Sequence, residues 1–425
     1  MKKVSLHKGW FILAITVLNI FACLGLGRFS LGAILPFMRE GLVLTYTEAG
    51  IIASAVFLGY LLSVISVGYF VQRFSTKNVI LAALLVLSLG MTLSVVAFNF
   101  WMAYVSLFII GLGSGGVNVP SLSLIRRWFS QKYRGMALGI TNSGSGLGMF
   151  ASGFLVPMLM LISNEGWRIS WGALAGAVIV IFLLNLFFLI EDPRMLNVLP
   201  VGQKELSEKE ETVQIGHGNL KAESHLIEHV YRSKWIFSIG LIYFTWGFSY
   251  LIYSTFFIDY LINDAAIEST TAGQFFAIAG VVSIVSGFIW GSLSDRIGRM
   301  LTLFIVYFCQ ATLLLAFVFT THPSIIFIET LLYALTLWAV PTVIVAAVSD
   351  MTKVEKTSAS IGFITLMFGI GQWISPVISG ALIDFYSSYT IAFYLSAGIC
   401  YAGSIGCIVV HLKLLKSPFS QSVEV

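Results

Sequence analysis

Long apolar segments dominate this chain and constrain its fold more than any other feature. A helix that crosses the ~30 Å hydrocarbon core of a bilayer needs about 20 apolar residues. Twelve segments reach that length, each bounded by charged residues, proline or asparagine. They lie near residues 10–38, 49–71, 78–98, 101–124, 135–162, 171–190, 235–258, 271–290, 300–320, 324–348, 358–383 and 389–410. We therefore expect an all-α membrane protein with twelve transmembrane helices.

The composition excludes two other classes of protein. Charged residues make up 10% of the 425 residues, whereas a soluble domain typically has about 25%. The 34 Phe and 10 Trp residues are the opposite of the composition of a disordered chain. The first segment, 10–38, is much longer than the apolar core of a signal peptide, which has about 7–15 residues. We therefore interpret it as an uncleaved first helix.

The distribution of basic residues predicts the orientation in the membrane. If the N-terminus lies in the cytoplasm, 21 of the 24 Lys and Arg residues fall in cytoplasmic segments. Only Arg39 and Arg168 fall in outer loops, and Arg28 lies inside the first helix. Cytoplasmic loops of membrane proteins carry an excess of Lys and Arg. We expect both termini in the cytoplasm and the protein in the plasma membrane, which in a bacterium is the inner membrane.

The chain also contains a weak internal repeat. Three landmarks of the first half recur in the second half at nearly one offset. They are Gly68 and Gly291, Pro120 and Pro341, and Pro157 and Pro376, at offsets of 223, 221 and 219 residues. Parallel repeats of this kind occur in secondary transporters, with the substrate site near the bilayer midplane. We therefore expect two pseudo-symmetric six-helix halves, 1–190 and 235–425, joined by a polar cytoplasmic linker, 191–234.

The loop after the eighth segment carries a motif. Gly291, Asp295, Arg296, Gly298 and Arg299 match the signature G-x-x-x-D-R-x-G-R of the major facilitator superfamily, which the whole chain resembles. The resemblance implies a twelve-helix transporter whose signature loops brace the cytoplasmic gate.

The first-half copy of the motif is degraded. Gly68 and Arg73 remain, but Gln72 replaces the usual Asp and Ser75 the usual Gly. This leaves open whether the first half has the Asp–Arg bracing of the family.

Local motifs point to a branch of the family. The Gly-Arg-Phe sequence at 27–29 is similar to a poorly characterised bacterial branch. The run from Arg127 to Phe129 and the run from Arg134 to Gly139 resemble the monocarboxylate and oxalate–formate branches. Drug–proton antiporters carry an Arg and a Gln in the fourth helix, where this chain has Leu107 and Ile110. Their Gly-Pro pair in the fifth helix is also absent, which disfavours multidrug efflux.

Arg28 is the sharpest candidate for a binding residue. It lies about 15 Å from the outer end of its helix at 1.5 Å per residue, and a charge at such depth costs ~2.5–3.5 kcal/mol on insertion scales. A guanidinium presents a planar fork that fits a carboxylate. We expect Arg28 to bind an anionic substrate. The alternative is a structural role, with Arg28 bonded to helix carbonyls or to Glu329.

Glu329 is the one acid well inside a predicted helix, about 9 Å below the outer surface. Three roles stay open for it. It could carry a coupling proton, pair with Arg28 at a gate, or be an ordinary acid near the interface.

Aromatic and amide side chains complete the candidate site. Tyr243, Trp246, Tyr250 and Tyr253 share one face of the seventh helix, where they either line a cavity or pack. Gln372 and Trp373 lie near mid-depth, and Asn142 either binds substrate or bonds Asn118. The candidate substrate-binding residues are Arg28, Asn142, Tyr243, Trp246, Tyr250, Gln372 and Trp373.

Other motifs predict packing rather than chemistry. Gly111, Gly113 and Gly116 match G-x-G-x-x-G, but no strand precedes them, so we reject a nucleotide site. The G-x-x-x-G pairs at 111/115, 135/139 and 144/148 predict close packing of the fourth and fifth helices. The sequence contains no protease, hydrolase or P-loop motif and no His or Cys cluster with metal-ligand spacing. We expect no enzymatic activity, cofactor, metal or nucleic-acid partner.

These observations predict a secondary transporter that works by alternating access. The favoured cargo is a small organic anion of the monocarboxylate kind, with protons as the candidate coupling ion and a monomer as the functional unit. The first alternative is a proton-driven exporter of a larger amphipathic compound, suggested by the aromatic face. A transport-dead membrane sensor is an alternative of another class.

Overall fold

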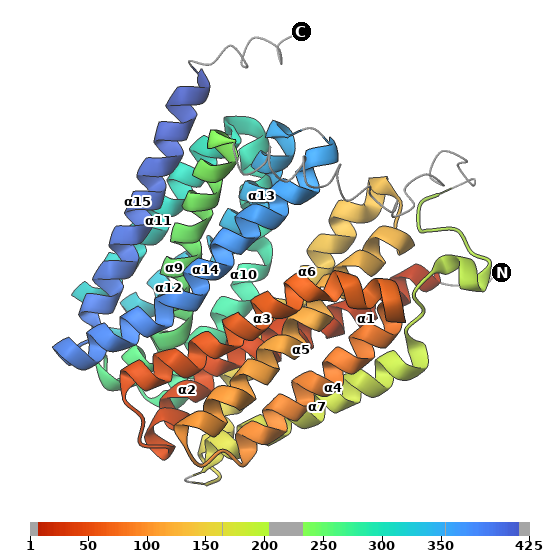
Figure 1. Cartoon of the computed structure of the whole chain (residues 1–425). Coiled ribbons are helices and arrows are strands. Elements are labelled where there is room, and N and C mark those ends of the chain that lie inside the picture. Colours follow the sequence, from red (N-terminus) through yellow and green to blue (C-terminus); the bar gives the residue numbers. More distant parts are fainter. Residues whose placement is uncertain (1–6, 164, 204–232, 353, 416–425) are drawn as a thin grey trace, which may run out of the picture. The chain divides into compact units, whose positions relative to one another are not determined.

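The computed structural model describes residues 7–163, 165–203, 233–352 and 354–415. It contains twelve helices in this part of the chain that are long and apolar enough to cross a membrane. The prediction of a twelve-helix fold is confirmed, and Figure 1 labels the elements in chain order.

The first spanning helix consists of α1 (Lys8–Ile20), a π-helical segment η1 (Phe21–Phe29) and α2 (Ser30–Gly41). The next five are α3 (Tyr46–Phe74), α4 (Thr76–Val95), α5 (Phe100–Trp128), α6 (Gln131–Met160) and α7 (Gly166–Phe188), followed by a 3-10 turn, η2 (Pro193–Leu196). The last six spans are α9 (Lys234–Asn263), α10 (Ser269–Ile297), α11 (Arg299–Phe319), the pair α12 (Pro323–Ala334) and α13 (Ala339–Met351), α14 (Val354–Tyr386) and α15 (Thr390–Leu415).

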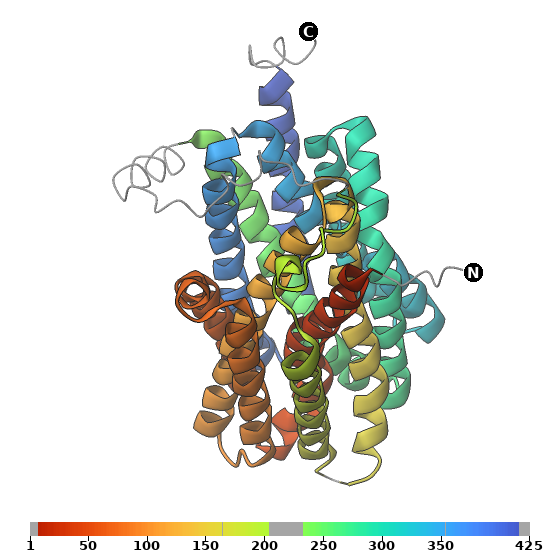
Figure 2. The same cartoon turned by 90° about the vertical axis from the view of Figure 1, so that its right-hand side faces the viewer.

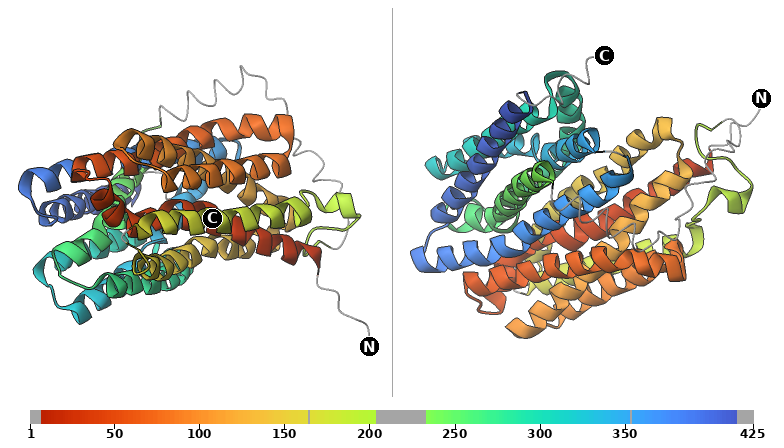
Figure 3. Two further views of the ribbon diagram at one scale, coloured as in Figure 1. Left: turned by 90° about the horizontal axis from the view of Figure 1, so that it is seen from below. Right: turned by 45° about the horizontal axis from the view of Figure 1, so that its top comes forward.

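The described residues fall into two compact units. The first holds α1 to α7 and the N-terminal part of α10, up to Val281, and the second holds α9, the rest of α10 and α11 to α15. In the first unit, η1 packs on α6 and α4 on α7; in the second, α9 packs on α14 and α11 on α15 (Figure 3). The first unit thus pairs span one with span five and span three with span six. The second unit pairs span seven with span eleven and span nine with span twelve, which is the same pattern six spans later and supports the pseudo-symmetry. The boundaries 1–190, 191–234 and 235–425 stay a prediction.

Glycines bring the helices of the first unit into close contact, as expected for two of the three G-x-x-x-G pairs. Gly111 of α5 lies against the α3 backbone at Val56, and a Cβ on Gly25 of η1 would lie 2.5 Å from Gly148 Cα of α6. Gly135 and Gly139 have open space beside them. The 111/115 and 144/148 pairs therefore permit close packing, of α5 on α3 and of α6 on the first helix, whereas the expectation was wrong for the 135/139 pair.

Two spanning helices are irregular. In η1 the Cys23 carbonyl accepts a hydrogen bond from the Ser114 hydroxyl at 2.6 Å. Between α12 and α13 the helix is interrupted at 335–338, where Trp290 donates to the Leu335 carbonyl at 2.9 Å and Gln310 to the Thr336 carbonyl at 3.0 Å. Backbone groups released from a helix inside a membrane must find other partners. Side chains of neighbouring helices supply them here.

The start of the predicted linker belongs to the first unit and packs on its helices. Val201 pairs with Phe129: its N–H donates to the Trp128 carbonyl at 2.8 Å, and its carbonyl accepts from the Ser130 N–H at 3.1 Å. The Trp128 indole donates to the Ile190 carbonyl at 3.0 Å. Figure 2 shows this yellow-green segment beside the start of α1 and the α5–α6 connection. Residues 204–232 of the predicted linker lie outside the described residues.

Candidate functional site

Arg28 lies in the π-helical segment η1 and is 9% exposed. Its guanidinium carbon lies 4.6 Å from the centroid of the Phe57 ring and 4.5 Å from that of the Tyr60 ring, both on α3. A cation over two aromatic faces gains electrostatic stabilisation from the ring quadrupoles. The rings therefore hold the guanidinium in place without using its N–H donors.

The donors of Arg28 remain available. Its Nε is buried without a hydrogen-bond partner. Within the described residues of its own unit, the guanidinium makes no hydrogen bond or ion pair that would neutralise it. The alternative in which helix carbonyls bind Arg28 therefore has no support in this unit. A buried guanidinium with open donors suits an anionic ligand.

The Tyr60 ring that contacts Arg28 carries a hydroxyl, which is bonded to Asn118. The Asn118 amide on α5 donates from Nδ2 to the Tyr60 hydroxyl at 2.8 Å, and Asn118 Oδ1 is buried without a partner. Asn142 is exposed on α6. Asn118 thus bonds Tyr60 rather than Asn142, which corrects the expected pairing of the two asparagines. No pattern in the sequence indicated that Tyr60 belongs with Arg28.

In the second unit, the predicted aromatic residues of α9 form a stack with Phe368 of α14. The ring centroids of Trp246 and Tyr250 lie 4.4 Å apart, and those of Tyr243 and Phe368 lie 4.5 Å apart. In both pairs the ring planes are within 14° of parallel. Tyr243, Trp246 and Tyr250 are all buried. Their ring faces contact one another, so packing accounts for much of this surface. The Trp246 indole N–H, however, is buried without a partner.

The two predicted residues of α14 have different environments. Gln372 is buried and donates from Nε2 to the Tyr250 hydroxyl at 2.6 Å. Its neighbour Trp373 is 41% exposed. Tyr253 packs against Tyr333 at 4.2 Å between ring centroids. The structure thus brings Gln372 to the aromatic stack and assigns Tyr253 to a separate aromatic cluster.

The second unit has two acidic residues inside helices, Glu329 and Asp259, that bear on the expected coupling site. Glu329 lies on α12, half-buried, with Oε2 buried and without a partner. Asp259 is also inside a helix: α9 extends to Asn263, beyond the predicted end at 258, and Asp259 is 1% exposed and bonded to Asn263. Asp259 is therefore a second buried acid, near the end of its helix. The apolar residues after Asp259 were the signal that α9 continues.

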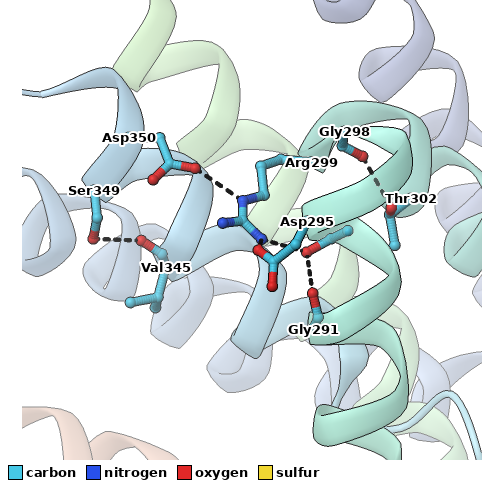
Figure 4. A network of polar contacts seen from close by, with 9 residues as sticks. Gly291, Asp295, Gly298, Arg299, Thr302, Val345, Ser349 and Asp350 are labelled. Atoms are coloured by element: carbon cyan, nitrogen blue, oxygen red, sulfur yellow. Dashed lines mark hydrogen bonds and ion pairs between the residues drawn. The ribbon is translucent and has the colours of Figure 1, made fainter. Parts of the chain in front are cut away.

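The second-half signature loop forms a compact polar network (Figure 4). Arg299 pairs with Asp295, donates from Nη1 to the Ser294 hydroxyl at 2.6 Å, and donates from Nε to Asp350 of α13 at 2.9 Å. Gly291 lies beside Thr342, and Arg296 is exposed. Arg299 thereby ties the start of α11 to the end of α10 and to α13.

The first-half loop lacks this network. Gly68 has open space beside it, and Arg73 is exposed, with its guanidinium carbon 5.7 Å from the Phe74 ring. Glu191 instead joins the neighbouring elements: it accepts from the Lys77 N–H at 3.1 Å and pairs with Arg127 at 3.7 Å. The Glu191 carboxylate, which follows α7, thus links α4 to α5, whereas the degraded loop makes no such link among the described residues.

Ser75 and Gly298 occupy equivalent positions with the same backbone. Ser75 has φ 76° and ψ 156°, and Gly298 has φ 93° and ψ 148°. A non-glycine residue in this region is strained by about 1–3 kcal/mol. The Ser75 hydroxyl caps α4 by accepting a hydrogen bond from the Asn78 N–H, but this bond is long, at 3.4 Å.

Ser75→Gly is expected to stabilise the protein by about 1 kcal/mol, and Gly298→Ala is expected to destabilise it by about 1–3 kcal/mol. Thermal unfolding of both variants checks this; a lower melting temperature for Ser75→Gly would contradict it.

Comparison with known proteins identifies the family of this chain. The family model of the Major Facilitator Superfamily matches residues 17–344. The chain belongs to this superfamily. It is therefore an integral multi-pass membrane transporter and not an enzyme, as the sequence predicted.

Several members of the superfamily with related sequences are named as transporters of organic anions. The chain is 24% identical over 377 residues to a probable sulfoacetate transporter of Cupriavidus necator, and each chain is covered to 83%. It is 22% identical to a hexuronate transporter of Bacillus subtilis, again with 83% of both chains covered. Monocarboxylate transporter 13 of Bos taurus is 23% identical, with 82% of this chain and 77% of that protein covered.

Solved structures share the superfamily fold at low identity. A bacterial homologue of the human lysosomal transporter Spinster, in an inward-facing and occupied conformation, has a TM-score of 0.75 at 14% identity and covers 97% of this chain and 100% of its own. A mutant of the nucleoside transporter NupG has a TM-score of 0.74 at 12% identity, with 94% of this chain and 99% of that chain covered. At this identity, the likeness concerns the fold alone.

Proposed function

We propose that this transporter moves a small organic anion by alternating access. The observation that carries the proposal is the guanidinium of Arg28, which is buried between Phe57 and Tyr60 with its donors unused in its own unit. Acetate-like, sulfonate and uronate ligands all present the oxyanion geometry that a guanidinium binds. The names of the related sulfoacetate, hexuronate and monocarboxylate transporters support the same class of cargo.

The other candidate contacts belong to the same proposal. We infer that Tyr243, Trp246, Tyr250 and Gln372 are the substrate contacts of the second unit, with the unpartnered Trp246 N–H as a donor. Asn142 and Trp373, both exposed, stay predicted contacts. The aromatic stack also favours the second candidate function, export of a larger amphipathic compound.

Uptake into proteoliposomes tests the function. We expect the purified protein to accumulate a radiolabelled carboxylate or sulfonate, and an excess of such anions to compete, whereas neutral sugars do not. Competition by neutral amphipathic compounds, with none by small anions, would favour the exporter.

We propose Glu329 as the group that couples transport to protons, because its Oε2 is buried without a partner. A carboxyl in such a site can exchange a proton without losing a hydrogen bond. Glu329→Gln should therefore retain anion exchange across the membrane but lose stimulation of net uptake by an acidic exterior. Uptake by the unaltered protein that ignores an imposed pH gradient would contradict the coupling.

We also propose that the Arg299 network stabilises one conformation of the cytoplasmic gate. Asp350→Asn and Asp295→Asn each remove one carboxylate from Arg299 and should slow uptake several-fold, with little change in anion affinity, because they bias a conformational equilibrium. Ser349→Ala, next to Asp350, removes only a bond to the Val345 carbonyl and serves as the control. Unchanged uptake rates in both Asp variants would contradict the gate role.

The proposal also covers the orientation of the chain in the membrane and its oligomeric state. The distribution of Lys and Arg supports cytoplasmic termini in the plasma membrane. We propose that the monomer is the functional unit, because a single chain supplies all twelve spanning helices of the described residues.

A further inference from the structure

Tyr60 links Asn118 to the surroundings of Arg28. The Tyr60 ring contacts the guanidinium, at 4.5 Å from its centroid to the guanidinium carbon, while its hydroxyl oxygen accepts the Asn118 N–H at 2.8 Å. Because the hydroxyl is used as an acceptor, its own proton is free to be donated. Asn118 is 8% exposed, and its Oδ1 is a buried acceptor without a partner.

The three side chains therefore offer a defined pattern of hydrogen bonding. Arg28 and Tyr60 present donors, and Asn118, which is bonded to the Tyr60 hydroxyl, presents an acceptor. A buried polar atom normally has a partner, and an orphan calls for a specific explanation. Donors suit the oxygens of an acid group, whereas the Asn118 acceptor suits an O–H.

We propose that Tyr60 and Asn118 select substrates that carry a hydroxyl close to the acid group. This inference rests on the proposed function of Arg28 as the anion site. Arg28 binds the acid group, Tyr60 donates to the same group, and Asn118 Oδ1 accepts the proton of a hydroxyl on an adjacent carbon. The preferred class is then the hydroxycarboxylates, above unsubstituted acids of the same length.

The amide orientation separates this class from another. If the Asn118 amide were turned by 180°, its oxygen would accept the Tyr60 proton and its NH₂ group would face the ligand. That arrangement would favour a carbonyl, as in a 2-oxo acid. The two orientations thus predict opposite preferences within one matched set of acids.

The test is ligand binding to the purified full-length protein, measured by calorimetry with lactate, propionate and pyruvate. Gluconate and hexanoate extend the comparison to longer acids. We expect the hydroxy acid to bind about tenfold more tightly than the unsubstituted acid. Asn118→Leu should weaken binding of the hydroxy acid about tenfold more than binding of the unsubstituted acid, which loses only the support that Asn118 gives to the Tyr60 hydroxyl. Tyr60→Phe should weaken both.

Matched controls separate selectivity from folding. Tyr104→Phe removes a phenolic hydroxyl elsewhere on α5, and Asn78→Leu replaces an exposed asparagine on α4; neither should alter the preference. Melting temperatures of all variants report whether they fold.

Three outcomes overturn the inference. A preference for pyruvate indicates the turned amide, and equal affinities that depend on Arg28 exclude selection of a hydroxyl while leaving the proposed function intact. Absence of any binding that depends on Arg28 contradicts the proposed function, and this inference with it.

Discussion

Replacing Arg28 with alanine is expected to reduce anion affinity at least about 100-fold, because hydrogen bonds to charged groups contribute about 1.5–3 kcal/mol each and 1.4 kcal/mol is a factor of ten. Arg28→Lys keeps the charge but loses the fork, and should reduce affinity about tenfold. Binding to the purified variants, followed as ligand-induced stabilisation, measures both effects.

The stability of the ligand-free variant gives an independent readout. Arg28→Ala loses two cation–π contacts, worth about 0.5–2 kcal/mol each, but removes a charge whose insertion costs ~2.5–3.5 kcal/mol. We therefore expect a melting temperature that is unchanged or raised. A structural ion pair with Glu329 would instead lower it, and Glu329→Gln would then restore it. A destabilised Arg28→Ala that regains stability and binding in that double variant would contradict the anion site.

The second large effect is expected at Gly148, where Gly148→Ala should destabilise the protein by at least about 3 kcal/mol or prevent its accumulation. A Cβ there would overlap the backbone of Gly25, and backbone atoms cannot rotate away as a side chain can. Because Gly25 lies in the same segment as Arg28, the variant should also weaken anion binding. Yield and melting temperature in detergent measure the effect on folding.

Gly139→Ala is the matched control on the same helix. Gly139 has nothing within 4 Å of the position of a Cβ, so the added methyl should change stability by less than about 1 kcal/mol. Similar losses in both variants would show that the effect comes from helix α6 itself, and not from its contact with the first helix.

The number and order of the spans could be predicted because each needs only enough apolar residues to cross the bilayer. Local departures from regular helix could not. Neither the interruption at 335–338 nor the π-helical turns at 21–29 changes the apolar pattern, since both depend on side chains from other helices, such as Gln310 and Ser114. The end of α9 was missed for a related reason: a single buried acid, Asp259, resembled a boundary.

Some residues of the candidate site could be predicted from the sequence, and others could not. Arg28 stood out because a lone charge in an apolar segment is expensive wherever it points. Its neighbours Tyr60 and Asn118 are ordinary in their own helices, and only the approach of α3, α5 and the first helix brings them together. The glycines that permit this approach were recognised, but their partners were not, because G-x-x-x-G marks a close contact without naming the other helix.

The π-helical segment has a consequence for comparing this chain with its relatives. A π-turn holds about one residue more than an α-turn, and each residue turns an α-helix by about 100°. The nine residues of η1 therefore set the rotational phase of everything that follows in the first helix. In a relative with one residue fewer there, an arginine at the aligned position would point to a different neighbour, even if every flanking residue were the same.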